Sequence, residues 1–160
     1  MKNYFGYDDK VCVVTGAASG MGKATAEMLV DLGARVYGMD WADVQVDGIE
    51  KNVHVNLGEK ESIDAAFTEI PDWIDCFFGI AGVSGARTDF LTTTKIDLLS
   101  NKYICENYLV DRMGQGSAIS FITSVAGNDW RLEGNKKVYL PVLAAASWED
   151  AVALLENSGL

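Results

Sequence analysis

Short apolar runs alternate with stretches whose apolar residues recur at helical spacing. The runs predict strands at residues 10–15, 34–39, 52–55, 74–80 and 117–122. The helical spacing predicts helices over residues 21–32, 59–70 and 96–113. Strands that alternate with helices in this way form right-handed βαβ units around a parallel sheet. We therefore predict a doubly wound α/β fold with five parallel strands in the order 3-2-1-4-5 and helices on both faces.

The pattern changes after residue 127. Residues 128–137 are polar and predict a loop, whereas Ser147, followed by Glu149 and Asp150, predicts a capped helix running to about Asn157. No internal repeat, low-complexity tract or Pro/Gly linker divides the chain. We expect one domain over residues 1–160, with a core at about 1–127 and a helical tail at 128–160.

A glycine-rich turn, Thr15-Gly16-Ala17-Ala18-Ser19-Gly20-Met21-Gly22, joins the first strand to the first helix. Gly16 permits a tight turn, Gly20 lets the backbone approach a pyrophosphate, and Gly22 lets helix and strand pack closely. The start of the helix presents unpaired N–H groups to an anion. The turn therefore predicts a dinucleotide site that includes Gly16, Ser19, Gly20, Met21 and Gly22.

The spacing Gly-x-x-x-Gly-x-Gly behind Thr15 resembles the cofactor signature of the short-chain dehydrogenase/reductase family. The resemblance covers roughly residues 8–127 and implies a Rossmann-type fold and hydride transfer between a secondary alcohol and a ketone. Asp40 ends the second strand, where a carboxylate accepts hydrogen bonds from the adenosine ribose and repels a 2′-phosphate. No Arg or Lys stands at Trp41 or at residues 17–19, so NAD(H) is expected over NADP(H).

Further cofactor contacts follow from the same resemblance. Asn56 and Leu57 stand where the family has an acidic and then an aliphatic residue facing adenine, although a plain turn asparagine is the alternative. Ala81 and Gly82 keep only the second half of the family's Asn-Asn-Ala-Gly, so the central sheet must be braced differently. We expect both residues beside the cofactor ribose, and we assign Trp41 to the cofactor site as well.

The catalytic residues of the family are matched only in part. Ser124 resembles the substrate-binding serine, whose hydroxyl bonds the substrate oxygen. Asn101 best matches the helix asparagine that holds a proton-relay water, with Asn107 as the fallback. The family's acid/base pair is a Tyr followed four residues later by a Lys, and no such pair follows Ser124. Tyr139 lacks the Lys, and Pro141 is expected to disrupt the helix that the pair requires.

Two interpretations of the missing pair remain open. Residues 128–160 resemble the helical insertion of bacterial 3α-hydroxysteroid dehydrogenase/carbonyl reductases, which favours a truncated NAD(H)-dependent oxidoreductase acting on a hydroxysteroid-like or other bulky carbonyl compound. The alternative is a catalytically inactive nucleotide-binding or interaction module. A reading frame that encodes Tyr-x-x-x-Lys soon after Leu160 decides for the enzyme, and a stop codon decides for the module.

The amino-acid composition and charge restrict the classes of partner that this chain can bind. The 160 residues include 13 Lys and Arg against 23 Asp and Glu, and the net charge of −10 disfavours nucleic acid. No apolar run approaches the ~20 residues that span a bilayer, and the N-terminus lacks a signal-peptide pattern. Cys12, Cys76 and Cys105 are far apart and fit buried thiols better than a metal site. His54 is expected to be structural, and we expect a cytoplasmic protein.

Assembly is predicted from apolar surface. The helix at residues 96–113 carries more apolar residues than a solvated face needs: Leu98, Leu99, Ile104, Tyr108 and Leu109. The run at 117–122 would also leave a strand edge with unpaired backbone groups. We predict a homodimer or larger homo-oligomer through the helix, the edge or both, unless the helical tail covers the edge. Trp148 in the tail is expected to be a lid or interface residue.

Overall fold

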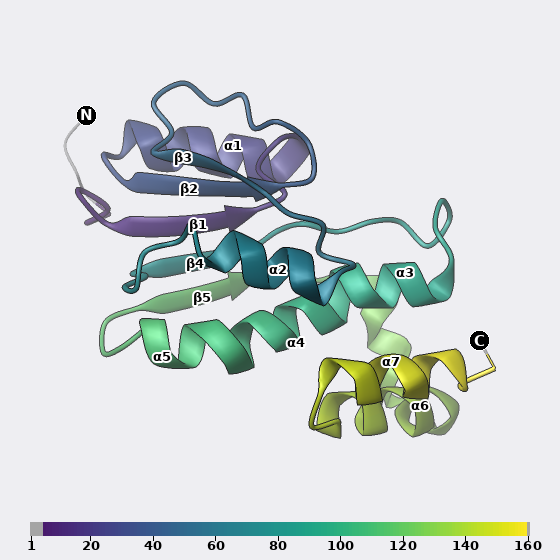
Figure 1. The fold of residues 1–160 in the computed structure, drawn as a ribbon. Coiled ribbons are helices and arrows are strands. Elements are labelled where there is room, and N and C mark those ends of the chain that lie inside the picture. The colour runs from purple at the N-terminus through teal and green to yellow at the C-terminus, as the bar shows by residue number, and fades with distance from the viewer. Residues whose placement is uncertain (1–4, 160) are drawn as a thin grey trace.

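The computed structural model describes residues 5–159 and contains one five-stranded sheet in which all neighbouring strands run parallel (Figure 1). The strand order is β3-β2-β1-β4-β5. The strands are β1 (Val11–Thr15), β2 (Arg35–Asp40), β3 (Lys51–His54), β4 (Cys76–Gly79) and β5 (Ala118–Phe121). The predicted order and the predicted doubly wound Rossmann-type fold are therefore confirmed.

Helices cover both faces of this sheet (Figure 1). Because successive strand residues point to opposite faces, Val14 of β1 packs with Leu29 on the face of α1 (Gly20–Asp31). Val13 packs on the other face, in the cluster that contains Phe67 of α2 (Lys60–Phe67). Both faces of β1 are buried, which explains why its sequence shows no alternation of apolar and polar residues.

A single long helix, residues 90–112, packs beside α2. It consists of α3 (Phe90–Thr94), a π-helical segment (Lys95–Leu99), α4 (Ser100–Ile104), a second π-helical segment (Cys105–Leu109) and α5 (Val110–Arg112). The helix begins before the predicted residue 96 because Asp89 caps it, accepting a hydrogen bond from the Thr92 amide at 2.9 Å.

The helical tail differs from the prediction in its first half. Residues 128–137 are not a loop, because they lie in a 3₁₀ helix (Val125–Arg131) and at the start of α6 (Glu133–Ala144). Pro141 lies inside α6, so the expectation that it would break the helix is wrong. Fully buried Val142 packs α6 into the core, and such packing offsets the ~3 kcal/mol that an internal proline costs.

The second half of the tail is as predicted. Helix α7 (Trp148–Glu156) begins after Ser147, whose hydroxyl accepts a hydrogen bond from the Asp150 amide at 3.0 Å. Helices α6 and α7 pack on each other and against the start of the long helix, away from β5 (Figure 1). The tail therefore does not cover the strand edge, and the Trp148 ring packs edge-on against Tyr103 of the long helix.

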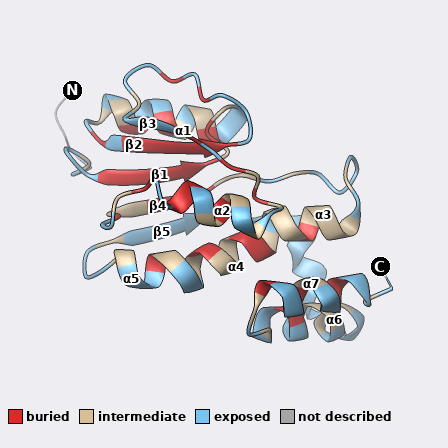
Figure 2. Cartoon of the chain, viewed as in Figure 1, coloured by how far each residue is buried: buried red, intermediate tan, exposed pale blue. Residues whose placement is uncertain are grey.

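The edge strand is exposed, whereas much of the predicted helix interface is buried. Figure 2 shows β1 and β2 buried and β5 exposed, and Phe121 is 39% exposed. Leu99, Ile104 and Leu109 are buried inside this chain, so they are not available to a partner. Within residues 5–159 no helix is long and apolar enough to cross a bilayer.

Candidate functional site

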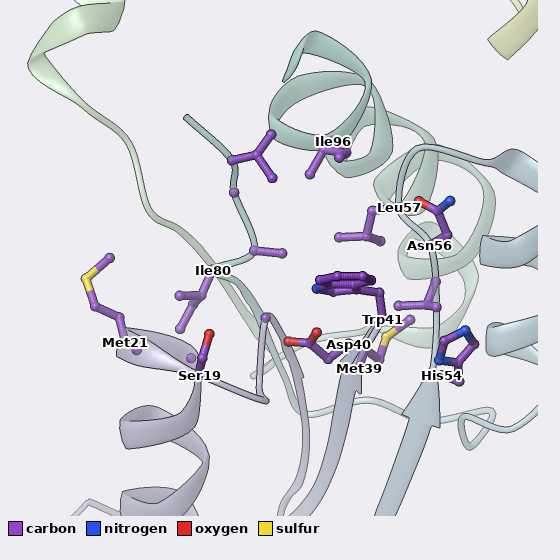
Figure 3. A pocket seen from close by; sticks show the side chains of 17 residues that line it. Ser19, Met21, Met39, Asp40, Trp41, His54, Asn56, Leu57, Ile80 and Ile96 are labelled. Atoms are coloured by element: carbon purple, nitrogen blue, oxygen red, sulfur yellow. The ribbon is translucent and has the colours of Figure 1, made fainter. Parts of the chain in front are cut away.

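The glycine-rich turn forms one wall of a cavity of about 570 Å³ at the carboxyl ends of the central strands (Figure 3). Helix α1 begins at Gly20, as predicted. Gly16 and Gly20 have φ values of +73° and +54°, which only glycine adopts without strain. A Cβ on Gly22 would lie 2.1 Å from the Gly16 carbonyl oxygen, so this glycine allows the close packing of helix and turn.

The structure brings together all eleven residues that the sequence assigns to the cofactor, and all of them line the cavity. They are Gly16, Ser19, Gly20, Met21, Gly22, Asp40, Trp41, Asn56, Leu57, Ala81 and Gly82. They come from the first turn of α1 and from the ends of β1, β2, β3 and β4, or the segments just after them, which meet at one edge of the sheet. Ligands of open α/β sheets bind at this edge, where the strand order reverses.

Asp40 is the one carboxylate that lines the cavity within residues 5–159, and the backbone fixes it there. It is only 8% exposed, and its Oδ2 accepts a hydrogen bond from the Ala18 amide at 2.9 Å. Its Oδ1 accepts a second from the Ala42 amide at 3.0 Å. Figure 3 shows the carboxylate directed toward the turn that carries Ser19. Each carboxylate oxygen can accept a further hydrogen bond, so Asp40 can still receive the two hydroxyls of a ribose.

Apolar side chains line the cavity beyond Asp40. Trp41 is 78% exposed, and its indole lies between Leu57 and Asp40 at the cavity (Figure 3). Ile96, from the long helix, lines the same region. The side-chain oxygen of Asn56 accepts a hydrogen bond from the Gly58 amide at 3.0 Å, which is the turn geometry that the sequence left open as the alternative.

The end of β4 is braced by Thr15, a residue that sequence reasoning did not assign to this task. The Thr15 Oγ1 accepts hydrogen bonds from the Ile80 and Ala81 amides, both at 3.1 Å. A Cβ on Gly16 would lie 2.8 Å from the Ala81 Cα, so the two loops are in close contact. Thr15 thus holds together the two walls of the cavity, in place of the amide side chains missing before Ala81.

Replacing Thr15 by valine tests this bracing. The variant keeps the shape of the side chain but leaves two amides unpaired, and we expect the free energy of unfolding to fall by about 2 kcal/mol. Urea unfolding of both proteins measures the change. Thr94→Val is the matched control, since its hydroxyl donates to the Phe90 carbonyl of its own helix, and we expect a loss below about 1 kcal/mol. Equal losses in both variants would contradict the bracing role.

The candidate catalytic residues lie outside the lining of the cavity. The side-chain amide of Asn101 donates to the Asp97 carbonyl at 3.1 Å, and its oxygen lies 2.9 Å from where a Cβ on Gly79 would stand. Asn101 therefore sits beside the end of β4, whereas Asn107 is exposed and donates to the Tyr103 carbonyl. Ser124 is exposed in the segment that follows β5.

Asp97 and Tyr139 do not line the cavity, and each has a defined contact beside it or in the tail. Asp97 accepts a hydrogen bond from the Val83 amide at 2.8 Å and so holds the loop after β4, while burial raises the pKa of its carboxyl. Tyr139 packs against Phe90 with ring centroids 6.4 Å apart, so its neighbours belong to the tail and the long helix. Among the described residues, no group of three or more His, Cys, Asp or Glu could hold a metal ion.

Sequence reasoning missed six residues that line the cavity: Met39, His54, Val55, Ile80, Val83 and Ile96. His54, expected to be structural, is exposed and lies at the cavity because it ends β3 directly opposite Asp40. Four of the six are adjacent in sequence to assigned residues, and His54 is the register partner of Asp40, so the order of the strands was the signal that could have found these five. Ile96 comes from the long helix, and no local motif marks it.

Comparisons with known proteins agree with this geometry. Residues 10–134 match the family model of the short chain dehydrogenases. Coniferyl-alcohol dehydrogenase of Pseudomonas sp. (strain HR199 / DSM 7063) is 35% identical over 132 residues, which cover 81% of this chain and 51% of that protein. NAD-dependent glycerol dehydrogenase of Listeria innocua is 39% identical over 90 residues, covering 50% of this chain and 35% of that protein. The chain thus spans about half the length, or less, of these relatives.

Solved structures share the fold. The 3-alpha-hydroxysteroid dehydrogenase of Pseudomonas sp. B-0831, complexed with NADH, superposes with a TM-score of 0.72 at 20% identity, over 94% of this chain and 57% of that one. A short chain dehydrogenase/reductase of Burkholderia phymatum, in complex with NAD, gives a TM-score of 0.61 at 22% identity, over 95% and 57%. Together with the match over residues 10–134, the fold and the turn show that this chain belongs to the short-chain dehydrogenase family.

Proposed function

We propose that the cavity binds NAD(H) and that the chain supplies the nucleotide-binding part of an oxidoreductase that interconverts a secondary alcohol and a ketone. The observation that carries this proposal is Asp40, a nearly buried carboxylate fixed by two backbone amides at the wall of the cavity. The names of two relatives, an alcohol dehydrogenase and an NAD-dependent dehydrogenase, support it. So do the NADH and NAD complexes of the two structural neighbours.

The binding mode follows from the residues of the cavity. The amides at the start of α1 would hold the pyrophosphate, and Asp40 would accept hydrogen bonds from the adenosine ribose. Trp41 and Leu57 would enclose the adenine, while Ala81 and Gly82 would lie along the second ribose. NAD, when bound, supplies the nicotinamide ring that accepts or delivers the hydride.

NAD(H) is preferred over NADP(H) in this proposal because of charge. Asp40 would face a 2′-phosphate at close range, and among the residues that the structure describes no Arg or Lys lines the cavity to offset the repulsion. A carboxylate that is already held by two amides has little freedom to turn away from the phosphate.

The substrate side of the proposal rests on Ser124 and Asn101. Ser124 would donate its hydroxyl to the substrate oxygen, and Asn101, rather than Asn107, would hold a water near the end of β4. None of the six tyrosines has a Lys four residues later, so these 160 residues hold no acid/base pair of the family type. That observation favours the second candidate, a nucleotide-binding module without turnover, for the chain taken alone.

We expect the purified 160-residue chain to bind NADH without reducing NAD in the presence of any alcohol. Titration of NADH fluorescence measures binding, and absorbance of the nicotinamide measures turnover with coniferyl alcohol, glycerol and a 3α-hydroxysteroid as probes. Saturable binding without turnover supports the proposal. Reduction of NAD by this chain would contradict the inference that these 160 residues lack the proton-transfer group, and absence of binding would contradict the cofactor site.

Assembly and location are proposed on separate grounds. We propose a small-molecule substrate, no nucleic-acid partner, and a homo-oligomer formed through the exposed edge of β5, since part of the long helix is already covered. The free cysteines support a cytoplasmic location. We expect light scattering at tens of micromolar to show a mass above that of one chain. A monodisperse species near 17.3 kDa would contradict the oligomer.

A further inference from the structure

Two cysteines lie directly opposite each other on neighbouring strands. Cys12 of β1 is the register partner of Cys76 of β4. Neighbouring strands lie about 4.8 Å apart, and a disulfide needs Cα atoms separated by about 4.4–6.8 Å, so this pair has the required spacing. Both side chains pack into the same apolar cluster, on the face of the sheet that α1 covers. They therefore point the same way.

The two thiols interact, and one of them is accessible. Burial, and to a lesser extent the neighbouring Cys76, raise the pKa of Cys12 to about 12. Cys12 is fully buried, whereas Cys76 is half-buried. The register partner of Cys76 on its other side is Ala118, a small and exposed residue of β5, so a small oxidant can approach Cys76 from the edge of the sheet.

We propose that Cys12 and Cys76 form an oxidation-sensitive dithiol that closes to a disulfide and ties β1 to β4. Hydrogen peroxide is the oxidant in this proposal. The Cys76 thiolate attacks one peroxide oxygen, breaking the O–O bond and giving a sulfenic acid and hydroxide. The Cys12 thiolate then attacks the Cys76 sulfur, forming the S–S bond and releasing a second hydroxide. With the two thiol protons, the sum is two thiols and one peroxide giving one disulfide and two waters.

The surroundings set the rate of this reaction. Burial is the main cause that raises the pKa of Cys76, and Asp75 raises it further, whereas the neighbouring Cys12 and the charge of Lys10 lower it. Tyr7 is the other titratable group near both thiols. Because a thiolate is the nucleophile in both steps and burial raises the pKa of both cysteines, closure is slow at neutral pH and accelerates as the pH rises.

The third cysteine provides the matched control. Cys105 lies on the long helix, packed against the opposite face of the sheet. Cys105→Ser removes a half-buried thiol of similar chemistry and leaves the pair intact, whereas Cys12→Ser removes one member of the pair. Neither cysteine of the pair lines the cofactor cavity, so the outcome does not depend on the proposed binding of NAD(H).

The experiment treats the full chain with hydrogen peroxide at pH 7 and pH 9, followed by alkylation in denaturant and peptide mapping by mass spectrometry. We expect one Cys12–Cys76 linked peptide, two hydrogens lighter than the sum of its parts, in the unmutated chain and in Cys105→Ser. Closure is faster at pH 9, dithiothreitol reverses it, and Cys12→Ser shows no such link. Retention of all thiols, sulfinic acid without a link, or links that involve Cys105 would each overturn the proposal.

Discussion

Replacing Gly22 by alanine is expected to unfold the chain or to lower its free energy of unfolding by at least about 3 kcal/mol. The added Cβ would lie 2.1 Å from the Gly16 carbonyl oxygen and 2.6 Å from the carbonyl carbon, and both are backbone atoms that no rotamer change can move. Helix α1 would have to shift away from β1, which opens the apolar cluster beneath it. Since domains are stable by only about 5–15 kcal/mol, a loss of about 3 kcal/mol is a large part of the free energy of unfolding.

Gly20→Ala is the matched control, because it makes the same chemical change two residues earlier. A Cβ on Gly20 meets no atom of the described residues within 4 Å, so the main penalty is the positive φ of +54°, about 1–2 kcal/mol. The new methyl group would instead occupy space beside the cavity that the proposed pyrophosphate needs. We expect a folded protein with weakened NADH binding. Urea unfolding followed by circular dichroism measures the free energy of unfolding of both variants. Equal stability of Gly22→Ala and Gly20→Ala would contradict this account.

Replacing Asp40 by asparagine is expected to narrow the preference for NADH over NADPH by at least about fivefold. A carboxylate and a phosphate about 4 Å apart repel each other by roughly 1–4 kcal/mol, between the dielectric of water and that near a protein surface, and each 1.4 kcal/mol is a factor of ten in affinity. Asparagine keeps a side-chain oxygen that can accept one of the two backbone hydrogen bonds, so it removes the charge with less damage than alanine. Competitive titration of both dinucleotides measures the ratio of dissociation constants.

Asp43→Asn controls for the change in net charge. Asp43 is exposed, lies three residues along the same segment and does not line the cavity. We expect its ratio of NADH to NADPH affinity to match that of the unmutated chain. Equal affinity of the unmutated chain for the two dinucleotides would contradict the role of Asp40, and so would an equal change in both variants.

The fold could be predicted from the sequence because the central strands are buried on both faces and the helices show one apolar face. Continuous apolar runs such as residues 11–15 have few alternatives to a parallel strand. The boundaries of the long helix were harder, since two π-helical segments change its period. The helix through Pro141 was missed because local propensity opposes it, while the packing of Val142 favours it.

The cavity residues that belong to a sequence motif could be predicted, and the others could not. Gly16, Gly20 and Asp40 have spacings that carry a physical mechanism, and all three line it. Thr15 was recognised only as the start of the turn, because its hydrogen bonds reach Ile80 and Ala81, 65 and 66 residues away. Ile96 reaches the cavity through the packing of the long helix on the sheet, which no local pattern encodes.

A crystal structure of the chain with bound NADH tests the central claim most directly. The account predicts a dinucleotide in the cavity with its pyrophosphate at the start of α1, its adenosine ribose within hydrogen-bond distance of Asp40, and its adenine against Trp41. Electron density for the dinucleotide elsewhere on the molecule, or in the cavity with the ribose away from Asp40, would contradict the account. So would an empty cavity at NADH concentrations that saturate the fluorescence titration.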